Sequence, residues 1–158
     1  MSFYTWNASM SVGDPYIDDD HKGLIHLINR LYENAEIEGQ YDILDDIAER
    51  LLDYTAFHFR REEQVLQACG YTALAAHKAE HDRFTADIHE NRDALKPETA
   101  AVTARALAEY LKAWLSDHIQ IRDAAYKPDI KGNDEARRVS ALFGPGLYTR
   151  LHAGARHP

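Results

Sequence analysis

Four long stretches of the sequence repeat apolar residues at intervals of three and four, and this spacing constrains the fold most strongly. Such a period is typical of an amphipathic helix that buries one face. The first stretch covers residues 18–38, and its apolar positions are Leu24, Ile25, Leu27, Ile28, Leu31, Tyr32 and Ala35. Similar patterns predict helices over residues 41–69, 72–95 and 98–126, with Thr72 as an N-cap and the last helix closing before Pro128.

The segments between these stretches are short and contain helix-ending residues. Gly39 and Gly70 follow the first two stretches, and Pro97 follows the third. Short connections force neighbouring helices to run antiparallel. The sequence therefore predicts an all-α fold, an up-down-up-down antiparallel four-helix bundle.

The two ends of the chain lack a sustained period. Residues 1–17 contain turn formers and predict an extended N-terminal arm. Residues 131–158 predict a short C-terminal tail, in which "EARRVSALF" could form one short helix before "GPG" breaks it. We therefore expect a bundle domain over residues 1–130 and a C-terminal extension over residues 131–158.

Composition excludes several classes of function. A chain of 158 residues fits one domain. Its net charge of -8 repels phosphate backbones, so we expect no nucleic-acid partner. No apolar run approaches the roughly 18 residues that span a bilayer, so the chain is not expected to insert into a membrane. A single cysteine, Cys69, and the lack of a secretion signal predict a cytoplasmic location.

Histidines and carboxylates at helical spacing predict a metal site. His58 and Glu62 are four residues apart, as are His77 and His81, so each pair projects from one helix face. His21 lies on the first predicted helix, and His118 and Asp123 lie on the fourth. Imidazole nitrogen and carboxylate oxygen suit iron, manganese or zinc more than copper(I).

The number of these donors favours two metals over one. A tetrahedral zinc needs four donors, whereas this set offers five imidazoles and two carboxylates. Two metals bridged by the carboxylates would use the whole set. Two divalent ions would leave positive charge unbalanced, which favours a bridging hydroxide or oxide.

The spacing of His118 and Asp123 leaves two alternatives open. Five residues turn an ideal helix by roughly 140° from the same face. Either a wider π-helical turn brings the two side chains together, or the aspartate reaches sideways across the seam between helices.

Each motif taken alone has an ordinary interpretation. "HKAEH" at residues 77–81 could be two surface histidines, and the charges of "HFRREE" could be solvated. Matching donors on four helices make the metal interpretation stronger. The remaining histidines stay outside the predicted set: His26 as a partly buried or capped residue, His89 as a solvated one, and His152 and His157 as exposed residues of the tail.

The motifs together resemble a known family. The segments "WNASMSVGDPYID", "DDDHKGLIHLINRLY", "HFRREE", "HKAEHDRF" and "WLSDHIQIRD" resemble the bacterial hemerythrins, and the likeness covers roughly residues 3 to 130. The resemblance implies that one iron is held by His77, His81 and His118. It implies a second iron held by His21 and His58, bridges from Glu62 and Asp123, and an open position for dioxygen on the second iron.

Two features depart from this family pattern. Family members often carry Gln directly before the first ligand histidine, where this chain has Asp20. A changed neighbour of a ligand alters how a metal site is tuned. The tail also extends past the usual fold, and the resemblance does not cover it.

The resemblance implies reversible dioxygen binding rather than enzymatic turnover, as a carrier, a store or a delivery protein that could dock on an oxygen-consuming partner. Leu24, Phe59, Trp114 and Leu115 would wall a dry oxygen pocket, with Leu115 as its gate, although ordinary core packing also explains them. A di-iron oxidase or peroxidase is the enzymatic alternative, but those sites use more carboxylates than imidazoles. An oxygen or redox sensor acting through a partner is the third.

Overall fold

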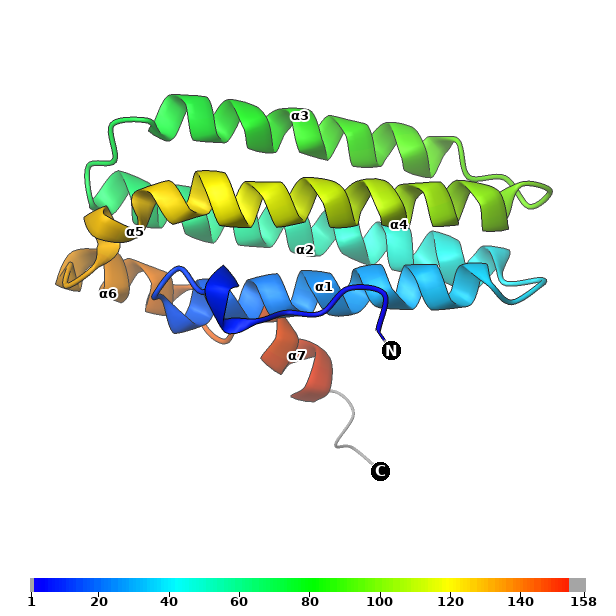
Figure 1. Cartoon of the computed structure of the whole chain (residues 1–158), viewed down its shortest axis with the longest axis horizontal. Coiled ribbons are helices and arrows are strands. Elements are labelled where there is room, and N and C mark those ends of the chain that lie inside the picture. Colours follow the sequence, from blue (N-terminus) through cyan, green and yellow to red (C-terminus); the bar gives the residue numbers. More distant parts are fainter. Residues whose placement is uncertain (1, 154–158) are drawn as a thin grey trace.

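A computed structural model describes residues 2–153, and in that range all regular elements are helical. Four long helices lie side by side lengthwise (Figure 1). They are α1 (Pro15–Ala35), α2 (Tyr41–Ala68), α3 (Leu74–Asp93) and α4 (Ala100–Asp117). Helix α1 packs against α2 and α4, and α2 packs against α3. The predicted antiparallel four-helix bundle is confirmed.

Local capping explains where α1 begins. The Asp14 carboxylate accepts hydrogen bonds from the backbone N–H groups of Tyr16 and Ile17, and Pro15 occupies the first helical position. These are favourable N-terminal residues because they satisfy or remove unpaired N–H groups. The helix therefore starts three residues before the predicted Asp18. The predicted N-cap at Thr72 is wrong: α3 begins after Ala73, without a side-chain cap.

The fourth helix does not stop where the sequence predicts. It passes from α4 into a π-helical turn, η2 (His118–Asp123), and continues as α5 (Ala124–Ile130). Pro128 therefore lies inside a helix rather than after one. It sits in the last turn of α5, where its missing N–H removes a single backbone hydrogen bond at the end of the helix.

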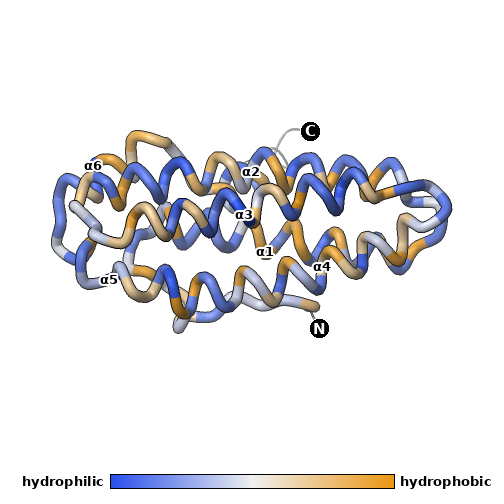
Figure 2. Tube along the Cα trace, turned by 90° about the horizontal axis from the view of Figure 1, so that it is seen from above, coloured by the Kyte–Doolittle hydropathy of each residue, from blue (hydrophilic) through white to orange (hydrophobic). Residues whose placement is uncertain are grey.

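The core lies between the four helices. Leu31, Ile88, Leu107 and Leu111 are at most 1% exposed. Burying each such side chain contributes about 1.5–3 kcal/mol. Hydrophobic and hydrophilic residues alternate along every long helix (Figure 2), as expected for a bundle with one buried face per helix.

The N-terminal arm crosses from α1 to α4. The backbone of Tyr4 exchanges two hydrogen bonds with the Asn29 side chain on α1, of 2.7 and 2.8 Å. Lys112 on α4 donates to the carbonyl of Phe3 at 2.7 Å. The arm therefore lies across α1 and α4 and is hydrogen-bonded to both helices. It includes the short helix η1 (Ala8–Met10).

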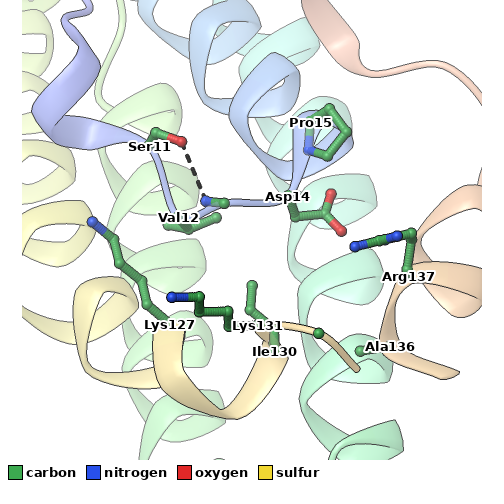
Figure 3. Close-up of a pocket in the computed structure, with 11 residues that line it drawn as sticks. Ser11, Val12, Asp14, Pro15, Lys127, Ile130, Lys131, Ala136 and Arg137 are labelled. Atoms are coloured by element: carbon green, nitrogen blue, oxygen red, sulfur yellow. Dashed lines mark hydrogen bonds between the residues drawn. The ribbon is translucent and has the colours of Figure 1, made fainter. Parts of the chain in front are cut away.

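The arm and the C-terminal segments together line an open pocket of about 370 Å³. Figure 3 shows residues of α5 and of the next helix, α6 (Asp134–Leu142), facing the arm across it. The Gly13 N–H donates to the Ser11 hydroxyl at 3.2 Å. Lys127, Lys131 and Arg137 line one side.

The tail contains two helices where the sequence predicts one. Helix α6 (Asp134–Leu142) falls on the predicted "EARRVSALF" segment, and α7 (Leu147–Ala153) follows the "GPG" break. Helix α6 packs on α2 at the end of the bundle where α1 begins, and α7 packs on α1 further along that helix (Figure 1). None of the helices described here is long and apolar enough to cross a membrane.

Candidate metal centre

All seven predicted ligand side chains meet inside the bundle. They come from α1 (His21), α2 (His58 and Glu62), α3 (His77 and His81) and the π-helical turn (His118 and Asp123). Each is at most 5% exposed. The structure thus brings together every donor that the sequence singled out.

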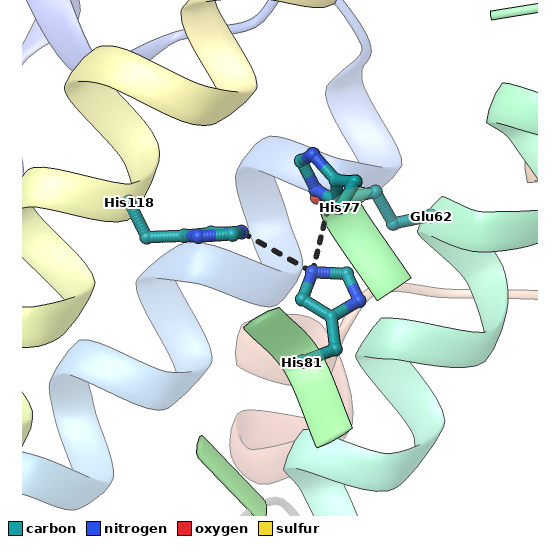
Figure 4. A group of neighbouring side chains, drawn as sticks. All are labelled: Glu62, His77, His81 and His118. Atoms are coloured by element: carbon teal, nitrogen blue, oxygen red, sulfur yellow. Dashed lines mark hydrogen bonds and ion pairs between the residues drawn. The ribbon is translucent and has the colours of Figure 1, made fainter. Parts of the chain in front are cut away.

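Three histidines gather on one side of Glu62. Ligand atoms of Glu62, His77, His81 and His118 all lie within 4.8 Å of one another. The Glu62 Oε1 atom lies 2.5 Å from His77 Nε2 and 3.2 Å from His81 Nε2. Figure 4 shows the four side chains converging from three elements. We call this group the three-histidine set.

Two histidines gather on the other side of Glu62. Ligand atoms of His21, His58 and Glu62 form a second compact group. The Glu62 Oε2 atom lies 3.4 Å from His58 Nε2 and 3.9 Å from His21 Nε2. We call this group the two-histidine set. Glu62 is therefore shared, with one oxygen turned toward each set.

Asp123 is the second carboxylate between the sets. Its Oδ1 atom lies 3.1 Å from His118 Nε2 and 3.2 Å from His77 Nε2, and its Oδ2 atom lies 3.2 Å from His21 Nε2. The wide π-helical turn produces this arrangement, so of the two alternatives left by the sequence the first is correct. Single π-helical turns often occur at functional sites for this reason.

Buried atoms without hydrogen-bond partners fit a metal in this cluster. Within residues 2–153, six buried side-chain atoms lack a partner, and five belong to this cluster: both ring nitrogens of His21, His81 Nδ1, and both oxygens of Asp123. Such atoms cost roughly 1–3 kcal/mol each when left unsatisfied. Since the ligand atoms of each set lie within 4.8 Å of one another, a cation between them would satisfy His21 Nε2 and both oxygens of Asp123.

The charges of the cluster are mutually dependent. Burial lowers the pKa of His58, but hydrogen bonds with Asp20 and Glu62 outweigh burial and raise it to about 10. Burial likewise lowers the pKa of His77, and Asp123 with Glu62 raise it to about 10. Burial raises the pKa of Glu62, whereas hydrogen bonds from the surrounding imidazoles hold it well below its usual value. Without metal, protons take the positions that cations would occupy.

Carboxylates also lie behind three of the imidazoles. Asp20 Oδ2 is 3.1 Å from His58 Nδ1, Glu80 Oε2 is 3.4 Å from His118 Nδ1, and Glu63 Oε2 is 3.7 Å from His81 Nδ1. Carboxylates in this position orient a ligand histidine and raise its basicity. The sequence suggested such a role for Asp20 beside His21, but its contact is with His58 on the next helix.

The four predicted oxygen-pocket residues all lie in or against the main hydrophobic cluster. Phe59 stacks on His81 with ring centroids 3.7 Å apart, and Trp114 stacks on His118 at 4.4 Å. Both aromatic residues therefore flank the three-histidine set. Leu24 and Leu115 are buried in the same cluster as Phe59, and Trp114 packs against it.

Two functional contacts were not foreseen from the sequence. The Tyr126 hydroxyl donates to Glu62 Oε2 at 3.1 Å, and Tyr126 is fully buried. The sequence contains one indication of this contact: Tyr126 lies three residues after Asp123, which places both residues on the same helix face. Arg61 is also fully buried and pairs with Asp20, whereas the sequence left open that the charges of "HFRREE" are solvated. Nothing local in the sequence indicates that partner.

The remaining histidines lie outside the cluster. His26 is half-buried, with its ring centroid 5.2 Å from that of His152 on α7. Burial, followed by the charge of His152, lowers the pKa of His26. His89 and His152 are exposed as predicted, and His157 lies outside the described residues.

The fold and this cluster define a class: a four-helix-bundle protein whose core holds a metal site of histidines and carboxylates. Comparison with known proteins narrows the class. Residues 12–130 match the family model "Hemerythrin HHE cation binding domain". The chain is 34% identical over 134 residues to a bacteriohemerythrin of Methylococcus capsulatus, covering 81% of this chain and 97% of that protein.

Further matches agree with this one. A bacteriohemerythrin of Stenotrophomonas maltophilia is 29% identical over 133 residues, covering 84% of this chain and 85% of that protein. A solved structure of wild-type hemerythrin matches with a TM-score of 0.70 and 27% identity, over 82% of this chain and 98% of that one. The chain belongs to the hemerythrin family. Its cofactor is accordingly a pair of iron ions bridged by oxide or hydroxide.

Proposed function

We propose that the protein binds dioxygen reversibly, as a carrier, store or delivery protein. In this assignment His77, His81 and His118 hold one iron, His21 and His58 hold the other, and Glu62 and Asp123 bridge them. Two ferrous ions held there would supply the two electrons that dioxygen takes up on binding and gives back on release.

One observation carries this proposal: the histidines are unequally divided on the two sides of Glu62. The three-histidine set faces Glu62 Oε1, and the two-histidine set faces Glu62 Oε2. With both carboxylates shared, the two-histidine side has one protein donor fewer. That side is therefore the one that can accept an additional small ligand.

The protein keeps water and protons away from this position. His21, Glu62 and Asp123 are fully buried. Leu24 and Leu115, each at most 3% exposed, belong to the adjoining hydrophobic cluster. A dry site protects a reactive ligand from proton leakage and hydrolysis. We assign these two leucines to the wall of the oxygen pocket, with Leu115 as its gate.

The donor ratio supports binding over catalysis. Di-iron oxidases in four-helix bundles use a Glu from each of two helices and Glu-x-x-His pairs from the others, so carboxylates outnumber imidazoles. Here five imidazoles accompany two carboxylates. We therefore propose that the protein is not an enzyme, although an oxidase or peroxidase activity is the alternative that the experiment below separates.

Location and partners follow from composition alone. One cysteine and a net charge of -8 support a cytoplasmic protein without a nucleic-acid partner. Transient docking on an oxygen-consuming protein is the delivery version of this proposal, and signalling through a partner is the sensor version.

The test compares visible spectra of the iron-loaded protein. We expect two irons per chain, an absorption band that appears when the ferrous protein meets air, and loss of that band on degassing. A band that cannot be reversed, with turnover of an added reductant, would instead support an oxidase. His81→Ala is expected to abolish the band, whereas His89→Ala, on the exposed face of the same helix, is expected to keep it. A single metal per chain would contradict the assignment.

A further inference from the structure

We propose that the C-terminal segment, residues 134–153, positions His58 through the buried pair of Asp20 and Arg61. The tail would then tune the two-histidine side of the metal centre rather than merely cover the bundle. This inference rests on the proposed function, because it takes His58 as an iron ligand.

Arg61 joins three parts of the protein. Its Nε atom donates to Asp20 Oδ2 on α1 at 2.9 Å. Its Nη2 atom donates to the carbonyls of Gly144 and Pro145 at 3.0 and 3.1 Å, and Nη1 donates to the carbonyl of Ser140. Because the guanidinium is always charged and here fully buried, it depends on these acceptors to offset the loss of water.

Three aromatic rings complete the surroundings of this guanidinium. Tyr16, Phe57 and Phe143 place their ring centroids 5.4, 5.2 and 5.7 Å from its central carbon. Phe143 comes from the tail, whereas Tyr16 and Phe57 come from the bundle. Arg61 therefore occupies a pocket that the tail helps to build, which distinguishes it from a surface ion pair of little energetic weight.

Asp20 carries the contact from Arg61 to His58. Its Oδ2 atom accepts from Arg61 and lies 3.1 Å from His58 Nδ1, and its Oδ1 atom accepts from the Leu147 N–H at 3.0 Å. A carboxylate accepts hydrogen bonds, so His58 carries its proton on Nδ1. Its Nε2 atom, 3.4 Å from Glu62 Oε2, is then the nitrogen that would bind iron in the two-histidine set.

The tail fits closely enough to fix Asp20. A Cβ atom at Gly23 of α1 would lie 2.6 Å from Leu147 Cβ and 2.7 Å from the Tyr148 nitrogen. A Cβ atom at Gly146 would overlap the Asp19 side chain, whose Oδ2 accepts from the Thr149 N–H at 2.9 Å. The start of α7 therefore cannot move outward without removing the Leu147 hydrogen bond from Asp20.

The hydrogen bond from His58 Nδ1 to Asp20 influences which oxidation state of the iron pair is favoured. A carboxylate on Nδ1–H makes an imidazole a stronger donor and fixes its ring orientation. A stronger donor favours the more oxidised, more highly charged iron. A neutral or displaced residue 20 would therefore weaken metal binding and raise the midpoint potential of the iron pair.

The first experiment replaces the charge without changing the size of the side chain. In Asp20→Asn we expect the affinity of the metal-free protein for Co²⁺ to fall by about 10- to 100-fold. We also expect the midpoint potential of the iron-loaded protein to become more positive. Asp19→Asn is the matched control, because Asp19 contacts the same tail helix but none of the seven clustered side chains. A lower melting temperature of Asp20→Asn with unchanged affinity and potential would overturn the proposal.

The second experiment moves the tail and leaves every residue of the cluster in place. In Gly146→Ala the added methyl displaces the tail from Asp19, and Gly23→Ala is a second variant acting on α7 itself. We expect faster tryptic cleavage at the exposed Arg137 and Arg138, and a potential shifted in the same direction as in Asp20→Asn. Faster cleavage with an unchanged potential would show that the tail is independent of the centre.

The outcomes separate this inference from the proposed function. A wild-type chain that fails to load two irons contradicts the proposed function itself. A wild-type chain that loads two irons and binds dioxygen, while Asp20→Asn and Gly146→Ala leave its potential unchanged, contradicts only the coupling to the tail.

Discussion

The Nε2 atom of His118 lies 3.1 Å from Oδ1 of Asp123, across the π-helical turn that the two residues delimit. An α-helix would place side chains five residues apart roughly 140° from each other around its axis. The wider turn reduces that angle and directs the second carboxylate oxygen to His21, 3.2 Å away. One irregular turn thereby makes Asp123 common to both histidine sets.

We expect Asp123→Asn to lose one metal. An amide offers one oxygen in place of two, so it cannot bridge both sets as the carboxylate does. Metal analysis of the purified variant is expected to give about one iron per chain, held by the three-histidine set, which retains Glu62. Asp129→Asn, an exposed aspartate on α5, serves as the control and is expected to keep two. Two irons in Asp123→Asn would rule out an essential bridge at this position.

The stability of the metal-free protein is expected to depend on pH above neutrality. The pKa values of His58 and His77 are raised to about 10 in the folded state, against about 6.5 in an unfolded chain. The folded state therefore binds the protons of His58 and His77 more tightly than the unfolded chain does. Their contribution to stability is complete below about pH 6.5 and disappears as pH rises toward 10.

Urea unfolding of the metal-free protein, followed by tryptophan fluorescence at pH 6 to 9, measures this effect. We expect the free energy of unfolding to fall steadily over that range. In the iron-loaded protein the same nitrogens hold metal rather than protons, so the decline is expected to be much weaker. Equal slopes for the two forms would show that these imidazoles do not exchange protons for metal.

Much of this structure can be predicted from two features of the sequence, the period of the apolar residues and the spacing of the metal-donor residues. They predict the four helices, whose apolar contacts recur three or four residues apart, and they pair His58 with Glu62 and His77 with His81 at a spacing of four. The approach of Asp123 to His118 depends instead on the π-helical turn, which the sequence left as one of two alternatives. The partner of Arg61 is 41 residues away, and the docking of α7 depends on two close approaches, at Gly23 and Gly146. Such contacts depend on the assembled tertiary structure, which local periodicity does not encode.

The buried hydroxyl of Tyr126 offers a test of how Glu62 is held. Tyr126→Phe removes the 3.1 Å hydrogen bond to Glu62 Oε2 and leaves the ring packing unchanged. We expect a loss of about 0.5–1.5 kcal/mol in the free energy of unfolding. Iron content is expected to stay at two per chain. The visible spectrum is expected to shift, because Glu62 Oε2 without this hydrogen bond keeps more negative charge for the metals. Tyr71→Phe is the control, since Tyr71 packs against Tyr126 at a centroid distance of 6.1 Å without touching Glu62 through its hydroxyl. An identical spectrum in Tyr126→Phe would show that the hydroxyl does not influence the centre.

The side chain of Leu115 provides the sharpest test of the oxygen pocket. It is 2% exposed and precedes His118 by about one helical turn. Leu115→Ala opens space beside the centre, admits water, and is expected to hasten the irreversible loss of the air-dependent absorption band several-fold. Leu107→Ala is the matched control, because Leu107 is equally buried on the same helix but lies about three turns from His118. Both variants are expected to lose about 2–5 kcal/mol of stability, so a faster loss of the band in Leu115→Ala alone separates gating from general loosening of the core. Equal rates of band loss in the two variants would mean that Leu115 is a core residue and not a gate.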